Sequence, residues 1–155
     1  FLSLKLKKHS PDLDSRLATS AALLHDITKT RSFDTNENHS ETGGLMLIKL
    51  GYPEVGDIIR QHVILDSYED NSRVSVEEIV NYSDKRILHD KVVSLNKRLE
   101  YIEFRYGANK EFKNRIQTMW KNTLELENKI FCQLDIKPNQ LSACVSKKIK
   151  KEDWI

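Results

Sequence analysis

Apolar residues recur every three or four positions along most of the chain, which is the spacing of a helix with one buried face. Leu17, Ala21 and Leu24 show this spacing near the start of the sequence. The longest pattern predicts a helix over about residues 109–134, and its inward face comprises Phe112, Ile116, Met119, Thr123, Leu126 and Ile130. No segment alternates apolar and polar residues for long enough to predict a β-hairpin. The pattern therefore predicts an all-α fold.

Capping residues indicate where individual helices begin. Asp14 or Ser15 is suited to the N-cap of an early helix, because a short side-chain oxygen accepts hydrogen bonds from the first exposed backbone N–H groups. Ser75, followed three residues later by Glu78, matches the reciprocal pattern called the capping box. The apolar spacing after this box predicts a helix that continues to about Ile87.

Turn residues and polar segments separate the helices. Gly51 and Pro53 lie between two helical patterns, where Gly ends one helix and Pro begins the next. Another helix is expected to stop near Gly107. The polar segments 28–38 and 66–73 have no helical period, and we interpret both as loops.

Length and composition favour one soluble globular domain. The chain has 155 residues, of which 39% are apolar and 31% charged. No apolar run approaches the roughly 18–20 residues that crossing a bilayer requires, so no membrane association is expected. A net charge of +2 is too small to indicate nucleic-acid binding, and the lysines near the C-terminal end are interpreted as a solvated tail. Two isolated cysteines indicate no disulfide framework, which favours a reducing, cytoplasmic compartment.

Five histidine and aspartate side chains are candidates for a metal site. His25 and Asp26 come directly after an apolar run. His39 follows the first polar loop, His62 lies near the end of a later helix, and Asp84 falls in a helix with a buried face. An aspartate facing a core is costly to bury unless it is paired or binds a cation. Imidazole and carboxylate together suit Fe, Mn, Ni, Co or Zn, whereas carboxylate alone leans toward Mg or Mn.

These residues also have interpretations that need no metal. His25 and Asp26 could form a hydrogen-bonded pair at a helix end, and Asp84 could form an ion pair with Lys85 or Arg86. The two later histidines could each be hydrogen-bonded at a helix edge. Composition and spacing alone leave these alternatives open.

The segment AALLHDITK, residues 21–29, resembles the signature of the HD superfamily of metal-dependent phosphohydrolases, which usually has Gly where Thr28 stands. The later candidates follow in that superfamily's order. They are His39 in ENHSETGG, His62 in IIRQHV and Asp84 in VNYSDKRI. The combination of the dipeptide with three further residues in order is more specific than any one of them.

The resemblance implies a helical bundle of the HD type with a metal centre. By position, His25, Asp26 and Asp84 would bind a first divalent ion. His39 and His62 would complete a second site, with Asp26 as the bridging carboxylate. The implied cofactor is one or two divalent ions of Fe, Mn, Ni, Co, Mg or Zn.

The resemblance further implies hydrolysis of a phosphoester, with a nucleotide as the expected substrate, by metal-activated water. Asp26 would orient or deprotonate the water, and Lys29 would contact the phosphate, so these two are the expected catalytic residues. Arg31 and Arg86 are weaker candidates for substrate binding. The alternative is a non-catalytic HD module that binds a nucleotide or a protein partner, and either form could be a homodimer.

The resemblance covers about residues 1–106, and residues 107–155 are interpreted as a helical extension of the same domain. The superfamily's early histidine would fall before Phe1, so we expect the sequence to begin after the start of the domain. His9 is a poor substitute, because it adjoins the break at Ser10-Pro11.

Overall fold

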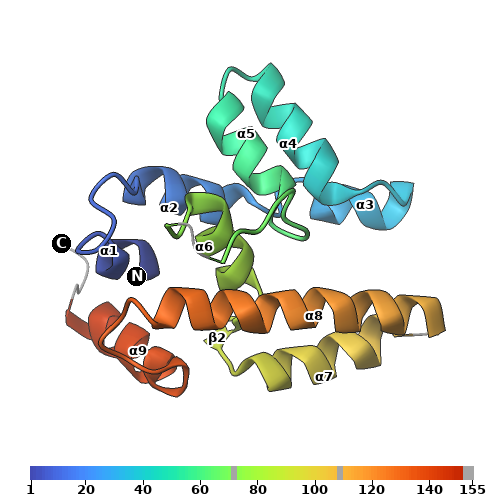
Figure 1. The fold of residues 1–155 in the computed structure, drawn as a ribbon. Coiled ribbons are helices and arrows are strands. Elements are labelled where there is room, and N and C mark those ends of the chain that lie inside the picture. Colours follow the sequence, from blue (N-terminus) through green and yellow to red (C-terminus); the bar gives the residue numbers. More distant parts are fainter. Residues whose placement is uncertain (71–72, 108–109, 152–155) are drawn as a thin grey trace. The chain divides into compact units, whose positions relative to one another are not determined.

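The computed structural model describes residues 1–70, 73–107 and 110–151. These residues form two compact units (Figure 1), one comprising Leu2–Asp84 and the other Lys85–Ile155 together with Phe1. Both units consist of helices, apart from one pairing of two short strands in the second unit. The predicted all-α fold is therefore confirmed. Each helix of the described residues is too short or too polar to span a bilayer.

The first unit carries short helices joined by turns and loops. Its elements are α1 (Leu2–Leu6), α2 (Ser15–Leu24), α3 (Lys29–Thr35), α4 (His39–Lys49), α5 (Pro53–Arg60) and α6 (Val76–Asp84). Asp14 caps α2, because its carboxylate accepts hydrogen bonds from the N–H groups of Arg16 (2.8 Å) and Leu17 (3.0 Å). The capping box before α6 is also confirmed: Ser75 N–H donates to Glu78 Oε2 (3.0 Å) and Glu78 N–H donates to Ser75 Oγ (3.3 Å).

Helices α4 and α5 lie side by side and antiparallel, as Figure 1 shows. The turn between them has Gly51 at φ +91 and Pro53 as the first residue of α5, as the sequence predicts. The two helices touch through their backbones, since a Cβ added to Gly44 would lie 2.7 Å from the carbonyl oxygen of Gly56. This arrangement brings the first residue of α4 beside the end of α5.

An apolar cluster supports these helices from within the first unit. It consists of Ala21, Leu47, Ile58, Ile59 and Val80, which come from α2, α4, α5 and α6. All five side chains are buried. The helix ends that carry the candidate ligands are therefore anchored on one packed core.

The second unit is built around one long helix. Its elements are β1 (Ile87–Leu88), β2 (Lys91–Val92), α7 (Leu95–Tyr106), α8 (Lys110–Phe131), a 3-10 turn η1 (Pro138–Gln140) and α9 (Leu141–Lys151). The two strands are antiparallel, with Ile87 opposite Val92. The inward face of α8 departs from the predicted stripe, because Trp120 is buried whereas Phe112 is 47% exposed.

Two predicted boundaries are wrong. The segment 28–38 is not wholly a loop, because it contains α3. None of the residues of α3 is buried, so this helix has no apolar period by which the sequence could reveal it. The second error concerns α6, which ends at Asp84 and not near Ile87. After Asp84 the chain turns into the strand pair, and the backbone of Arg86 accepts a hydrogen bond from Val93 N–H (2.8 Å).

Candidate metal centre

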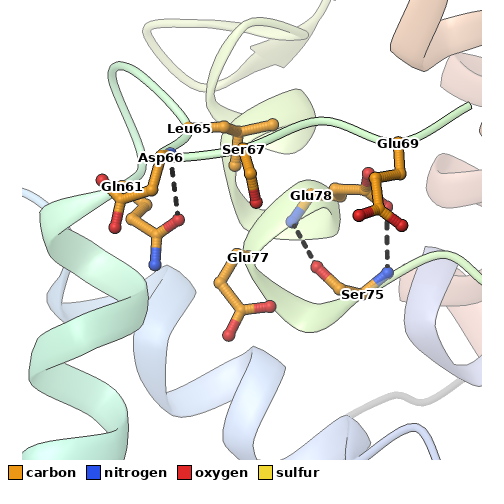
Figure 2. A pocket seen from close by; sticks show the side chains of 8 residues that line it. All are labelled: Gln61, Leu65, Asp66, Ser67, Glu69, Ser75, Glu77 and Glu78. Carbon is orange, nitrogen blue, oxygen red and sulfur yellow. Dashed lines mark hydrogen bonds between the residues drawn. The ribbon is translucent and has the colours of Figure 1, made fainter. Parts of the chain in front are cut away.

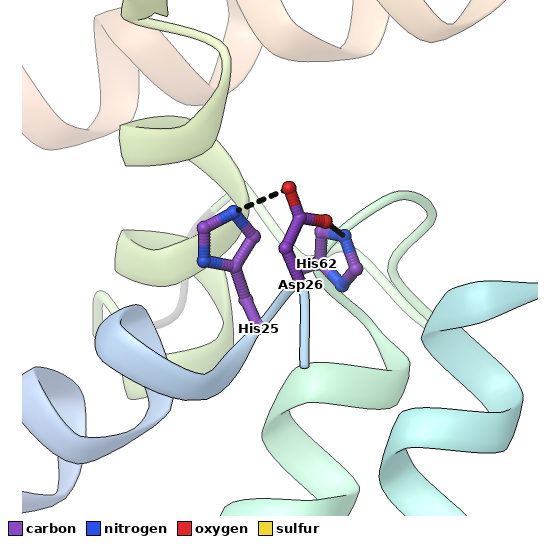
Figure 3. Close-up of side chains that lie close together, drawn as sticks. All are labelled: His25, Asp26 and His62. Atoms are coloured by element: carbon purple, nitrogen blue, oxygen red, sulfur yellow. Dashed lines mark ion pairs between the residues drawn. The ribbon is translucent and has the colours of Figure 1, made fainter. Parts of the chain in front are cut away.

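His25 and Asp26 occupy the turn that follows α2. Leu24 is the last residue of that helix and His25 is its C-cap. Hydrogen bonds from Ile27 N–H to Leu24 (3.0 Å) and from Lys29 N–H to Asp26 (2.9 Å) close the turn. Adjacent residues within a helix point about 100° apart, whereas a turn removes this restriction. Both side chains can therefore reach one space, and Figure 3 shows them pointing toward each other and toward His62.

The remaining candidates reach this space from three helix ends. His39 is the first residue of α4, His62 follows the C-cap of α5, and Asp84 is the last residue of α6. The antiparallel packing of α4 and α5 places His39 Nε2 3.2 Å from His62 Nε2. The structure thus brings together all five residues that the sequence proposes as metal ligands.

The carboxylate of Asp26 lies at the centre of this cluster. Its Oδ2 is 3.4 Å from His25 Nε2, and its Oδ1 is 3.3 Å from His39 Nε2 and 3.5 Å from His62 Nε2. Asp84 Oδ1 joins through His25, whose Nε2 is 3.6 Å away. Ligand atoms of His25, Asp26 and His62 all lie within 4.8 Å of one another, which is close enough to hold one ion.

Backbone carbonyls orient two of the histidine rings. His25 Nδ1 lies 2.8 Å from the carbonyl oxygen of Ala22, and His62 Nδ1 lies 2.6 Å from that of Ile59. A carbonyl oxygen only accepts, so both Nδ1 atoms must carry the proton. In the neutral rings, each Nε2 then presents a lone pair toward the Asp26 carboxylate. This is the orientation that metal-binding histidines adopt.

Acceptor atoms that face one another need a shared proton or cation. Within the part of the chain that the structure describes, Asp26 Oδ1 is buried and has no hydrogen-bond partner of good geometry. A buried carboxylate oxygen in this state is costly. A divalent cation among these nitrogen and oxygen atoms would remove that cost, so the residues present fit a metal ion.

The pKa shifts of Asp26 and His25 also indicate that the cluster favours a positive charge. Burial raises the pKa of Asp26, but its contacts with His25, His39, His62 and Lys29 outweigh burial and hold this pKa well below its usual range. Burial lowers the pKa of His25, but contacts with the Asp26 and Asp84 carboxylates outweigh it and raise the pKa to about 10. The Asp26 carboxylate is therefore charged, and without a metal ion His25 supplies a positive charge by holding a proton.

The predicted substrate-binding residues fall in different surroundings. Lys29 Nζ is 2.7 Å from Asp26 Oδ2, so its ammonium group lies at the cluster. Arg31 is on the exposed α3, where its Nε is 2.5 Å from Glu37 Oε1. Arg86 belongs to the second unit, and its guanidinium donates to Val93 O, Pro138 O and Glu127 Oε2. These bonds favour a structural role for Arg86.

Sequence reasoning missed the polar residues that join the ligand-bearing segments. Thr28 Oγ1 donates to the carbonyl oxygen of His39 (2.8 Å), and Asn81 Nδ2 donates to that of Gln61 (2.9 Å), next to His62. Both side chains are buried. These bonds join residues that are 11 and 20 positions apart, so no local sequence pattern predicts them.

A pocket of about 430 Å³ lies at a different place in the first unit (Figure 2). It is lined by residues from the end of α5, the loop that follows it and the beginning of α6: Gln61, Leu65, Asp66, Ser67, Glu69, Ser75, Glu77 and Glu78. None of the five clustered residues lines it. Its acidic lining does not suit a phosphate group.

Comparison with protein families matches residues 1–102 to the HD domain. The matched range contains the whole first unit and therefore all five clustered residues. No curated protein and no solved structure matches the chain significantly.

Proposed function

The chain belongs to the HD domain family of metal-dependent phosphohydrolases, and from this premise we propose that it hydrolyses the phosphoester of a small molecule, a nucleotide by preference. The observation that carries the proposal is the convergence of His25, Asp26, His39, His62 and Asp84 in one cluster. Their nitrogen and oxygen atoms form a donor set suited to a divalent ion.

Asp26 would contribute to metal binding on both sides of its carboxylate. His25 and Asp84 lie on the Oδ2 side of this carboxylate, and His39 and His62 lie on its Oδ1 side. One or two ions of Fe, Mn, Ni, Co, Mg or Zn would be held there. Because three of the five ligands are imidazoles, the transition metals suit the site better than Mg.

Each protein group has a distinct part in the proposed reaction. A divalent ion bound at the cluster would polarise phosphate oxygens and lower the pKa of a nearby water. Asp26 would orient the attacking water by accepting a hydrogen bond from it, since its lowered pKa keeps the carboxylate charged. Lys29 already touches Asp26, so its flexible side chain would reach a phosphoryl oxygen placed beside that carboxylate. Its positive charge would then offset the charge that develops on the phosphate. Arg31 on α3 would add a second, more exposed cation.

Metal content and turnover test this proposal together. We expect the purified chain to hold one or two equivalents of a transition metal and to release phosphate or an alcohol from members of a phosphoester panel that includes nucleotides. Asp26→Ala should lose both the metal and turnover. Asp34→Ala is a matched control, because Asp34 is an exposed aspartate on α3 outside the cluster.

Two results would contradict the proposal. Normal turnover by Asp26→Ala without metal would show that the cluster is not the active site. A wild-type chain that retains its metal but hydrolyses no member of the panel would instead favour an HD module that binds its ligand without cleaving it.

A further inference from the structure

Thr28 connects the turn that carries Asp26 with the helix that carries His39. It lies two residues after Asp26, and its side chain is among the most buried polar groups of the first unit, at 4% exposure. Its Oγ1 donates to the carbonyl oxygen of His39 (2.8 Å) and lies 3.0 Å from Thr42 Oγ1. Thr28 therefore contacts the first turn of α4 at two points.

The two hydroxyl groups lie together at the first turn of α4. A carbonyl oxygen only accepts, so the Thr28 proton goes to His39 O (2.8 Å). The single proton of the Thr42 hydroxyl has two acceptors within reach, Asn38 O (3.1 Å) and Thr28 Oγ1 (3.0 Å). Gly43 leaves room for this arrangement, because a Cβ there would lie 3.3 Å from Thr28 Oγ1. The Thr28 side chain thus fits closely against α4.

The covalent path between these residues is a weak constraint by comparison. It runs through α3, and no residue of α3 is buried. The contact of α4 with α5 fixes His39 relative to His62. The turn that carries Asp26 reaches α4 through the side chains of Ile27 and Thr28, both of which lie beside Gly43. The Thr28 hydrogen bond is the directional part of this connection, because it acts on the backbone of His39 itself, whose Nε2 lies 3.3 Å from Asp26 Oδ1.

His39 also differs from the other two histidines of the cluster. His25 and His62 are each oriented by a bond from Nδ1 to a backbone carbonyl of the same helical segment. Among the described residues, His39 Nδ1 has no such hydrogen-bond partner, and its Nε2 is the ring atom that makes contacts. The position of this ring therefore depends on how its backbone is held.

We infer that Thr28 is a positioning residue that places His39 against Asp26 and so completes the Oδ1 side of the metal centre. The inference rests on the proposed function, because it assumes that the cluster binds a metal ion. Thr28 touches neither the ion nor the substrate and acts through His39. Outer partners of this kind typically change metal affinity by about 10–100-fold.

Cobalt binding tests the inference without relying on turnover. The full chain is depleted of metal and titrated with Co²⁺ while its visible d–d absorption, which reports ligand number and geometry, is recorded. We expect Thr28→Val, which keeps the β-branched shape but removes the hydroxyl, to weaken Co²⁺ binding about 10–100-fold and to change the spectrum. Thr28→Ser keeps the hydroxyl and should restore both.

A matched control and a double variant separate positioning from general damage. Thr19→Val makes the same chemical change on α2, where the exposed Thr19 hydroxyl donates to Ser15 O (2.8 Å), and should bind Co²⁺ like the wild type. In a His39→Ala background, Thr28→Val should cause no further loss of affinity, because the group through which it acts is gone. Circular dichroism checks that each variant is folded, and Thr28→Ala replaces Thr28→Val if the latter is not.

The outcomes distinguish this inference from the proposed function. Wild-type affinity and spectrum in folded Thr28→Val would overturn the inference alone. An equal loss of affinity in the presence and absence of His39 would also overturn it, since Thr28 would then act by another route. A wild-type chain that binds no Co²⁺ would overturn the proposed function and this inference with it.

Discussion

Both units of the molecule bury atoms of charged side chains, but they differ in the hydrogen-bond partners that they provide for them. In the second unit, the Arg86 side chain is 5% exposed, and its guanidinium donates to two backbone carbonyls and to Glu127. In the first unit, Asp26 Oδ1 is buried without a partner of good geometry while histidine nitrogens converge on it. The protein itself supplies the acceptors for Arg86. At Asp26, Lys29 and the protonated His25 lie beside Oδ2, whereas Oδ1 faces His39 and His62 without a donor of good geometry.

This contrast shows which feature marks a functional site. Burial of a charge is common to both units and does not distinguish them. The difference is that the second unit matches a donor to acceptors, whereas the first unit directs several acceptors at one another. A bound cation would satisfy the facing acceptors of the first unit. The Arg86 site of the second unit has no need of a cation.

The largest expected effect comes from breaking the satisfied pair in the second unit. Arg86→Met should lower the free energy of unfolding by about 3–5 kcal/mol, because it removes a buried donor to two backbone carbonyls and leaves the partly buried Glu127 carboxylate without its arginine. Adding Glu127→Leu should recover a large part of this loss. Urea denaturation of both variants measures the effect.

The metal content of the same variants tests whether the Arg86 site is independent of the metal centre. Folded Arg86→Met should keep its metal equivalents, since Val93, Pro138 and Glu127 are not residues of the cluster. Loss of metal from folded Arg86→Met, with Asp26→Ala keeping its metal, would reverse the roles assigned to the two regions.

A pH effect of intermediate size should appear only in the first unit. Its source is His25, whose pKa rises from 6.5 to about 10 in the folded, metal-free chain. The stabilisation from its proton is complete below pH 6.5 and is lost as the pH rises toward 10. A metal ion must displace this proton, so apparent metal affinity should increase over the same range, by about tenfold per pH unit.

Two measurements check this prediction. Thermal unfolding in the presence of a chelator should show stability falling between pH 6.5 and 10 in the wild type, and less so in His25→Gln. Asp26 does not cancel the trend, because its lowered pKa keeps it charged throughout this window. A metal affinity that stays constant from pH 6.5 to 9 would contradict the assignment of a protonated His25 in the metal-free cluster.

The smallest effect should come from a residue that supports the fold but not the site. Asp14→Ala removes the N-cap of α2 and should cost about 0.5–2 kcal/mol of stability. Metal affinity should be unchanged in the folded protein, because the cap lies at the opposite end of α2 from His25. Asp34→Ala serves as the control. A decrease in stability no greater than in that control would show that the cap contributes nothing.

The helix boundaries that could be predicted depend on neighbours in sequence. Asp14 caps α2 through residues two and three positions later, and Ser75 and Glu78 bond across three positions. The turn at Gly51 likewise needs only one residue with positive φ before Pro53. By contrast α3 was missed, because a helix without a buried face carries no apolar period.

The pair His25-Asp26 was found because it follows an apolar run and resembles a family signature. His39, His62 and Asp84 were found because they follow the pair in the order of that family. The local pattern of the sequence was thus enough to predict the helical class, the caps of α2 and α6 and the turn at Gly51-Pro53, whereas the caps Asn38 of α4 and Ser94 of α7 were not predicted. Three contacts became visible only in the folded chain: Asp26 Oδ1 faces both later histidines, Thr28 bonds to His39, and Arg86 bonds to Glu127 in the second unit. The physical reason is range: caps and turns are set by contacts within a few residues, whereas these pairings join residues 11 to 41 positions apart and exist only once the helices have packed.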